Sequence, residues 1–137
     1  MLGVKGYSSD YIAACRARIE AGLAAYHAAV DTTQPAAKAF ETSYFNAMVL
    51  LLDYAFVHRL RTVEGKDGNA LNEVRVICQS LLEHGGVMTA DKAIKLVPEK
   101  SVLKYAYGSE IQVSEADFGL IRDAFFAEIE RKFSSGD

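Results

Sequence analysis

The stretch YFNAMVLLLDYAFV, residues 44–57, is the most hydrophobic part of this 137-residue chain and decides its fold. Placed on a helix, its apolar side chains cover almost the whole circumference and leave a narrow polar strip at Asn46 and Asp53. A run of 14 residues with two polar positions is too short for a membrane span, which needs about 20 apolar residues. It therefore predicts a core helix, which we expect to extend from about Ala36 to Val63.

A helix that is apolar on nearly every side needs partners on nearly every side. Either it is central to the domain, or a second copy of the chain covers its exposed face. The sequence therefore favours a homo-oligomer, most simply a two-fold dimer. We expect Asp53 on the solvent strip, because an unpaired buried carboxylate is costly. The alternative is an ion pair with one of three arginines, Arg59, Arg61 or Arg75.

Three further helices are predicted, each with one apolar face. The first begins after Ser8-Ser9-Asp10 and ends near Val30. The next covers residues 69–84 and stops at the following glycine pair. The last begins with the capping-box pattern S-x-x-D at Ser114 and continues to about Phe133.

Residues 87–113 are expected to hold little helix, because Pro98 interrupts any long element. Two β-prone runs, 102–107 and 110–113, flank the pair Gly108-Ser109, which suits a two-residue hairpin turn. The predicted fold is mainly α, a four-helix bundle with a small β-hairpin between the third and fourth helices. We expect a single helical domain over residues 1–137, in which residues 1–8 and 134–137 fray.

Composition excludes several classes of protein. The net charge of -3 and the pI near 5.6 give no general basic face, so we expect no nucleic-acid partner. The two cysteines form no CxxC pair, and we expect no metal site. Phosphate-loop and dinucleotide motifs are not found, so the cofactor stays unknown. The first residues lack the apolar segment of a signal peptide, which predicts a cytoplasmic protein without membrane association.

The stretch FVHRLRTVEGKDGNALNEVR, residues 56–75, concentrates polar residues around a glycine turn. On a helix continued to residue 63, the spacing of Tyr54, His58 and Arg61 places all three on one side. Glu64 ends that helix, and the following turn leads into the next one. The candidate ligand-binding residues at this corner are Tyr54, His58, Arg61, Glu64, Lys66, Asn69, Glu73 and Arg75.

This corner has a structural and a functional interpretation. In the structural one it is a capped helix junction, with cations near a helix C-terminus and acids near a helix N-terminus, as the helix dipole prefers. In the functional one, Arg61, Lys66 and Arg75 hold the carboxylate or phosphate of a small anionic ligand near a helix N-terminus.

A catalytic version of the functional interpretation centres on His58. Its ordinary pKa lies near neutrality, so it could act as a general acid or base, oriented by Glu64 or Glu73. No nucleophile–base pair is visible in the sequence, so the catalytic residues stay unknown.

Five segments of the chain resemble a family of small uncharacterised bacterial proteins. They are FVHRLR (56–61), EGKDGN (64–69), NEVR (72–75), DKAIK (91–95) and SVLKYAYGSEI (101–111). The resemblance extends from about Phe40 to Phe133, about two thirds of the chain. It implies a self-contained cytoplasmic domain and no particular activity, substrate or cofactor.

The leading functional hypothesis is a non-enzymatic, oligomeric binding or interaction protein. It depends on the excess of apolar surface on the core helix and on the lack of a catalytic motif. The alternative is a small-molecule enzyme or a metal-binding helical-bundle protein that uses His58, Arg61 and Glu64.

Overall fold

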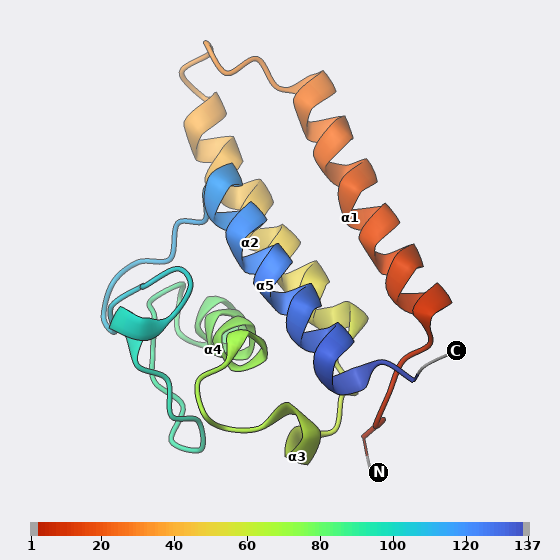
Figure 1. Ribbon diagram of the computed structural model, residues 1–137. Helices are drawn as coiled ribbons and strands as arrows, with labels where there is room; N and C mark the ends of the chain where they lie inside the picture. The colour runs from red at the N-terminus through yellow and green to blue at the C-terminus, as the bar shows by residue number, and fades with distance from the viewer. Residues whose placement is uncertain (1–2, 136–137) are drawn as a thin grey trace.

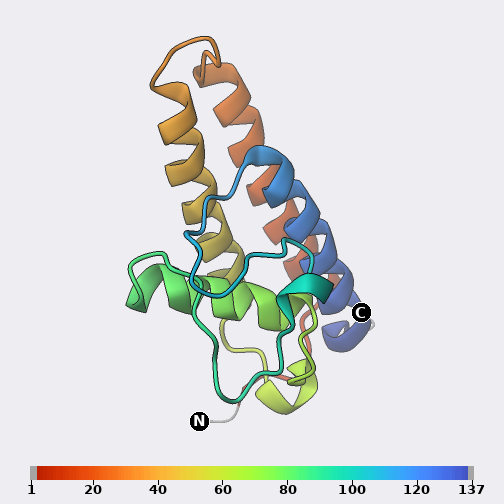
Figure 2. The ribbon, with the colours of Figure 1, turned by 90° about the vertical axis from the view of Figure 1, so that its left-hand side faces the viewer.

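The computed structural model describes residues 3–135 and is mainly helical (Figure 1). The antiparallel helices α1 and α2 form a tall pair, α5 packs along α2, and α4 crosses beneath them (Figure 2). In chain order the helices are α1 (Ser9–Ala29), α2 (Ala37–Ala55), α3 (Arg61–Glu64), α4 (Ala70–Glu83), the 3-10 helix η1 (Pro98–Lys100) and α5 (Glu115–Phe133).

Three of the four long helices begin and end within two residues of the predicted limits. Each has a local cap: the side chains of Ser8, Asn69 and Ser114 accept hydrogen bonds from N–H groups in the first turns of α1, α4 and α5. Such caps satisfy N–H groups that a helix leaves free at its N-terminus. Because a cap involves only neighbouring residues, the sequence alone was enough to predict these helix starts.

Aromatic rings from α2, from Phe56 directly after it and from α5 meet in the core. Phe45 lies 5.6 Å from Phe118, and Phe56 lies 5.7 Å from Phe125, measured between ring centroids. All four side chains are fully buried, and α2 also contacts α1 and α4. The prediction of a central helix within residues 44–57 is therefore confirmed for the sides of α2 that face α1, α4 and α5.

The C-terminal end of α2 differs from the prediction. The helix ends at Ala55 instead of continuing to residue 63, and a turn leads to the separate helix α3. Arg59 is the physical reason, because its guanidinium turns inward and donates to the carbonyl oxygen of Phe56 at 3.1 Å. The backbone around Arg59 instead pairs with Val4: Val4 donates to the carbonyl of residue 58 at 2.8 Å.

This early end corrects the predicted geometry of the corner. Tyr54 is the second-last residue of α2, His58 lies in the turn, and Arg61 begins α3. The three side chains therefore do not share one side of a helix.

The predicted β-hairpin between α4 and α5 is not formed. Residues 3–135 contain isolated bridges but no strand. The turn at Gly108 exists, since the N–H of Ser109 donates to the carbonyl of Ala106 at 3.0 Å, but the two expected arms do not pair. Instead, Glu110 forms an antiparallel bridge with Val87.

A long-range contact explains why residues 102–107 form no strand. The N–H groups of Val102 and Leu103 both donate to the carboxylate of Glu73 on α4, at 2.8 Å. Next to them, Lys104 has a left-handed backbone with φ 59°. These constraints fold the segment against α4 instead of against residues 110–113.

The terminal segments lie side by side. Tyr7 donates from its N–H to the carbonyl of Phe133 at 2.6 Å, and Ser135 donates back to Tyr7 at 3.1 Å. Fraying was expected for residues 1–8 and 134–137, of which 1–2 and 136–137 lie outside the described residues. None of the helices within residues 3–135 combines the length and hydropathy that a membrane span requires.

Candidate functional site

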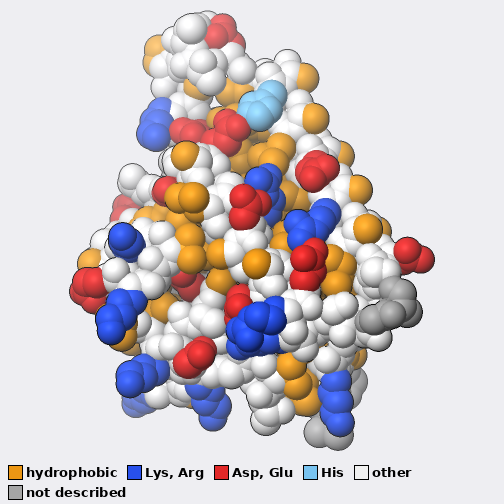
Figure 3. All heavy atoms as spheres, in the orientation of Figure 1, with side chains coloured by type: hydrophobic (Ala, Val, Ile, Leu, Met, Phe, Trp, Pro, Cys, Tyr) orange, Lys and Arg blue, Asp and Glu red, His pale blue; other side chains and the backbone are white. Residues whose placement is uncertain are grey.

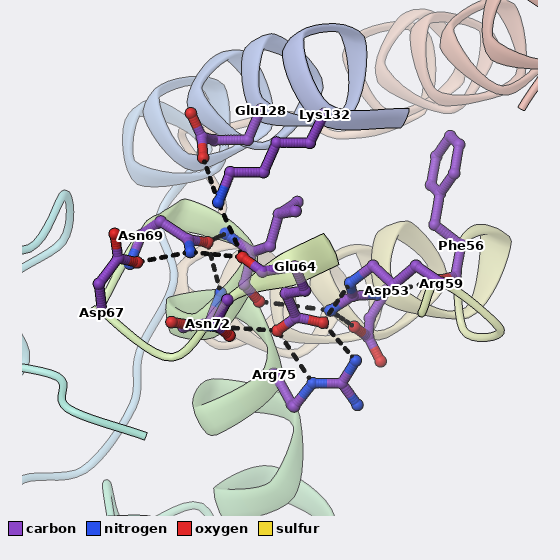
Figure 4. Close-up of polar contacts among 12 residues, drawn as sticks. Asp53, Phe56, Arg59, Glu64, Asp67, Asn69, Asn72, Arg75, Glu128 and Lys132 are labelled. Atoms are coloured by element: carbon purple, nitrogen blue, oxygen red, sulfur yellow. Dashed lines mark hydrogen bonds and ion pairs between the residues drawn. The ribbon is translucent and has the colours of Figure 1, made fainter. Parts of the chain in front are cut away.

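The polar corner is organised around the buried carboxylate of Glu64 (Figure 4). Its Oε1 accepts hydrogen bonds from Arg59 Nε (2.9 Å) and Arg75 Nη2 (2.6 Å). Its Oε2 accepts from Asn72 Nδ2 (2.8 Å) and Arg75 Nε (3.1 Å). A carboxylate has about four acceptor positions, so the chain itself saturates Glu64.

Arg59 is the second centre of this network, and it is also buried. Besides Glu64, it donates from Nη2 to Asp53 Oδ1 at 2.9 Å and to the carbonyl of Leu71 at 3.3 Å. The Asp53 side chain is only 17% exposed. The expectation that Asp53 lies on a solvent strip is therefore wrong, and the alternative, a pair with Arg59, is correct.

The glycine turn after Glu64 is held by two asparagines. Asn69 donates from Nδ2 to the carbonyl of Glu64 at 2.8 Å, and Lys132 of α5 donates to the same oxygen at 2.8 Å. Asn72 accepts from the N–H of Gly68 at 2.9 Å and donates to the carbonyl of Gly65 at 3.0 Å. The turn is thus fixed to both α4 and α5.

The charges of the corner balance one another. Burial alone would raise the pKa of Glu64, but hydrogen bonds from Arg75 and the charges of Arg59 and Arg75 lower it below its ordinary value. Together with Asp53, the corner holds two acids and two arginines. An ionised carboxylate with every acceptor position filled is neither a free base nor a free metal ligand.

Glu73 is a second buried carboxylate, and it has a different environment. Its oxygens accept from the backbone N–H groups of Val102 and Leu103, and no ion pair joins it to an arginine or lysine within the described residues. Burial raises its pKa, and these hydrogen bonds only partly offset the rise.

The predicted site residues divide into two groups. Glu64, Asn69 and Arg75 belong to the internal network just described, and Glu73 holds the neighbouring segment. Four others are exposed to solvent: Tyr54, His58, Arg61 and Lys66.

Two of the exposed residues line a shared groove. Tyr54 and His58 meet Tyr7 and Tyr11 in a hollow of about 340 Å³. The hydroxyl of Tyr7 is buried and, within the described part of the chain, has no hydrogen-bond partner. Arg61 and Lys66 do not line this groove.

Asn72 was not among the candidate ligand-binding residues, and Arg59 was considered only as a possible partner of Asp53. A signal for Asn72 was present, since Asn69, Asn72 and Arg75 recur every three residues and share one side of α4. For Arg59 there was no comparable signal, because its inward turn depends on partners outside its own segment, such as the carbonyl of Leu71 on α4.

The chain matches no known protein family, and it shows no significant similarity to any curated protein or solved structure. Within residues 3–135, no three His, Cys, Asp or Glu side chains are grouped so that they could hold a metal ion. The function therefore has to be inferred from the geometry of the molecule.

Proposed function

We propose that the chain is a non-enzymatic interaction protein that works as a homodimer, joined through one exposed face of α1 and α2. We take the four long helices as a four-helix bundle whose central helix, α2, is covered on its other side by a second copy. One observation carries the proposal: α2 leaves Phe40, Leu51 and Tyr54 in solvent, with 49%, 38% and 73% of their surface exposed.

We call this surface the outer face. It consists of one stripe of exposed residues on α1 and one on α2. Within each stripe the residues are three or four apart, so they lie along one side of the helix. Arg18 of the α1 stripe and Leu51 of the α2 stripe line one hollow, so the two stripes adjoin there. The outer face comprises Tyr11, Ala14, Arg18, Ala21 and Ala25 of α1, and Phe40, Ser43, Ala47, Leu51 and Tyr54 of α2.

The outer face is turned away from the rest of the bundle. The opposite side of α1 contacts α5 through an ion pair between Arg16 and Glu130 and a hydrogen bond between His27 and Glu115. Figure 2 shows α5 on one side of the α1–α2 pair, with the other side open above α4. Scattered exposed apolar residues are ordinary, but a continuous apolar surface on two helices is typical of an interaction site.

The shape of the outer face favours a second copy of this chain as the partner. The α1 stripe is mostly alanine and the α2 stripe carries the large side chains. A two-fold axis parallel to the helices places α2 of one copy on α1 of the other, so that large residues meet small ones. Arg18, the single charged residue of the outer face, then lies opposite the α2 stripe of the other copy and not opposite another arginine.

The size of the outer face is sufficient for such a dimer. Helices of 21 and 19 residues are about 30 Å long, and two side by side are about 20 Å wide. This footprint of about 600 Å² per copy, or about 1,200 Å² in total, is at the lower end of specific protein–protein interfaces.

Sedimentation equilibrium of the wild type and of two matched variants tests the proposal. Leu51→Glu places a charge in the middle of the outer face and should weaken dimerisation at least about thirtyfold, roughly 2 kcal/mol. Leu120→Glu makes the same change on α5, where the side chain is 57% exposed, and should leave the dimer intact. A wild type that stays monomeric at high concentration would contradict the proposal, as would equal effects of the two substitutions.

The alternative function, an enzyme or metal-binding protein at His58, Arg61 and Glu64, has less support. The acceptor positions of Glu64 are used by the arginines and Asn72. His58 is exposed and has no hydrogen bond to Glu64 or Glu73 that would orient it, within the described residues.

A further inference from the structure

A separate hollow, of about 360 Å³, lies beside the turn between α3 and α4. One wall is the glycine turn, and the other is the segment that leads into η1. Its lining residues are Asp67, Gly68, Lys95, Val97 and Lys100. None of them belongs to the outer face, so this hollow is independent of the proposed dimer.

The hollow has more positive than negative charge. Lys95 and Lys100 are exposed, and neither ammonium group has an ion-pair or hydrogen-bond partner within residues 3–135. The backbone of Lys66 adjoins that of Lys95, because its carbonyl accepts the N–H of Lys95 at 2.8 Å. In Figure 3, lysine and arginine side chains gather along the lower left edge, where Figure 1 places η1 and the preceding loop.

Asp67 is the one acid among the lining residues, and it is already engaged. Its Oδ1 accepts from Asn69 Nδ2 at 2.7 Å and from the N–H of Asn69 at 3.3 Å. These bonds lower the pKa of Asp67, with a further contribution from the charge of Lys132. Asp67 therefore compensates the lysines less than an unengaged carboxylate would.

The first wall of the hollow is fixed by close packing. Gly68 has φ 89°, and a Cβ at this position would lie 2.4 Å from the carbonyl oxygen of Lys95. Only glycine allows this approach without strain. On its other side, Gly68 is held by Asn72, which also binds Glu64.

The second wall is fixed by groups outside the hollow. Glu73 holds Val102 and Leu103, just beyond η1. The hydroxyl of Tyr107 donates to the carbonyl of Leu96 at 2.7 Å. The two buried carboxylates thus each hold one wall, Glu64 through Asn72 and Glu73 through the segment after η1, so that the lysines face a preformed space.

We propose that this hollow binds a small soluble anion that carries at least two negative charges on phosphate-type oxygen atoms. Lysine ammonium groups act as point charges and are common phosphate ligands. Two of them, Lys95 and Lys100, beside one concave space suit a compact polyanion better than a single carboxylate. A flat anionic lipid surface offers the same phosphate chemistry, but it would not enter a hollow.

The test is a titration of the ¹⁵N-labelled protein with inorganic pyrophosphate, followed by NMR. Amide signals of residues 66–68 and 95–100 should shift and saturate, and rising salt should weaken the binding. The double variant Lys95→Ala/Lys100→Ala should weaken binding at least tenfold. A matched pair, Lys5→Ala/Lys92→Ala, removes the same charge outside the hollow and should bind as the wild type does.

A parallel arm distinguishes a soluble anion from a lipid headgroup by using vesicles of phosphatidylglycerol and phosphatidylcholine. The proposal expects pyrophosphate binding and no vesicle binding. It is overturned if pyrophosphate shifts no signals, if the shifts spread over all basic residues, or if both lysine pairs have equal effects. Binding to vesicles without binding to pyrophosphate also overturns it. Thermal unfolding of each variant checks that the exposed substitutions leave the fold intact.

Discussion

The polar corner and the outer face break the usual distribution of residues in opposite ways. At the corner, the charged side chains of Arg59 and Glu64 are buried. On the outer face, Phe40, Leu51 and Tyr54 are exposed. Burying charge and exposing large apolar groups both cost free energy unless something compensates.

The difference lies in where the compensation comes from. At the corner it is internal, because the arginines and Asn72 fill every acceptor position of Glu64. On the outer face, no helix within residues 3–135 covers the exposed stripes. A region that is satisfied within the chain has a structural role, whereas a region that is not points to a partner.

The largest effect is expected from breaking the corner. Glu64→Ala leaves two arginines without their buried partner and should lower the free energy of unfolding by about 3–5 kcal/mol. Urea denaturation measures this loss. Glu83→Ala, an exposed substitution at the end of α4, is the control and should change stability by less than about 0.5 kcal/mol. A cost below about 1 kcal/mol for Glu64→Ala would show that the network is not structural.

A smaller effect distinguishes the two buried carboxylates, because their contributions to stability change with pH in opposite directions. The pKa of Glu64 lies below its ordinary value of 4.5, so its stabilisation is present above pH 4.5 and is lost as the pH falls through the folded-state pKa. The pKa of Glu73 lies above 4.5, so its contribution is present below pH 4.5 and is lost as the pH rises through the raised value.

Glu73→Gln isolates the second contribution, because glutamine does not titrate. Between pH 4 and pH 7, the wild type should lose stability relative to this variant. Urea denaturation of both proteins across that range provides the comparison. A difference that does not change with pH would mean that Glu73 ionises as easily in the folded chain as in the unfolded one.

The smallest effect on the free energy of unfolding is expected from a substitution on the outer face. Leu51→Glu, which should disrupt the dimer, should alter the unfolding free energy of the monomer by no more than about 0.5 kcal/mol, because the side chain is already partly in water. Unfolding at a concentration below dimer dissociation gives this value. A large loss would place Leu51 in the core and remove the contrast with Glu64.

Local signals made much of the fold predictable. The starts of α1, α4 and α5 follow from Ser8, Asn69 and Ser114, whose cap bonds reach only two or three residues along the chain. The end of α2 and the missing hairpin could not be predicted, because both depend on contacts between distant segments. Arg59 pairs with a helix that follows the turn, and Glu73 binds a segment about 30 residues away.

The sequence predicted which residues meet at the corner, but not what they do there. It predicted that Glu64, Asn69 and Arg75 lie at one corner, and the structure places them there. Whether their hydrogen-bonding capacity is filled internally depends on Arg59 and Asn72, whose inward orientation is set by tertiary packing. A count of polar residues near a glycine turn does not distinguish a saturated network from an open site.

The most direct test asks which region lies at the dimer contact. Distances between the two copies can be measured by double electron–electron resonance with spin labels. One variant, Ala28→Cys, carries the label at the rim of the outer face, and the other, Arg61→Cys, carries it at the corner. Both native cysteines are buried, so the label reacts at the introduced sites. We predict a short, well-defined distance between the Ala28→Cys labels and a longer one between the Arg61→Cys labels. A shorter distance at Arg61→Cys would contradict the account, since it would place the contact at the polar corner.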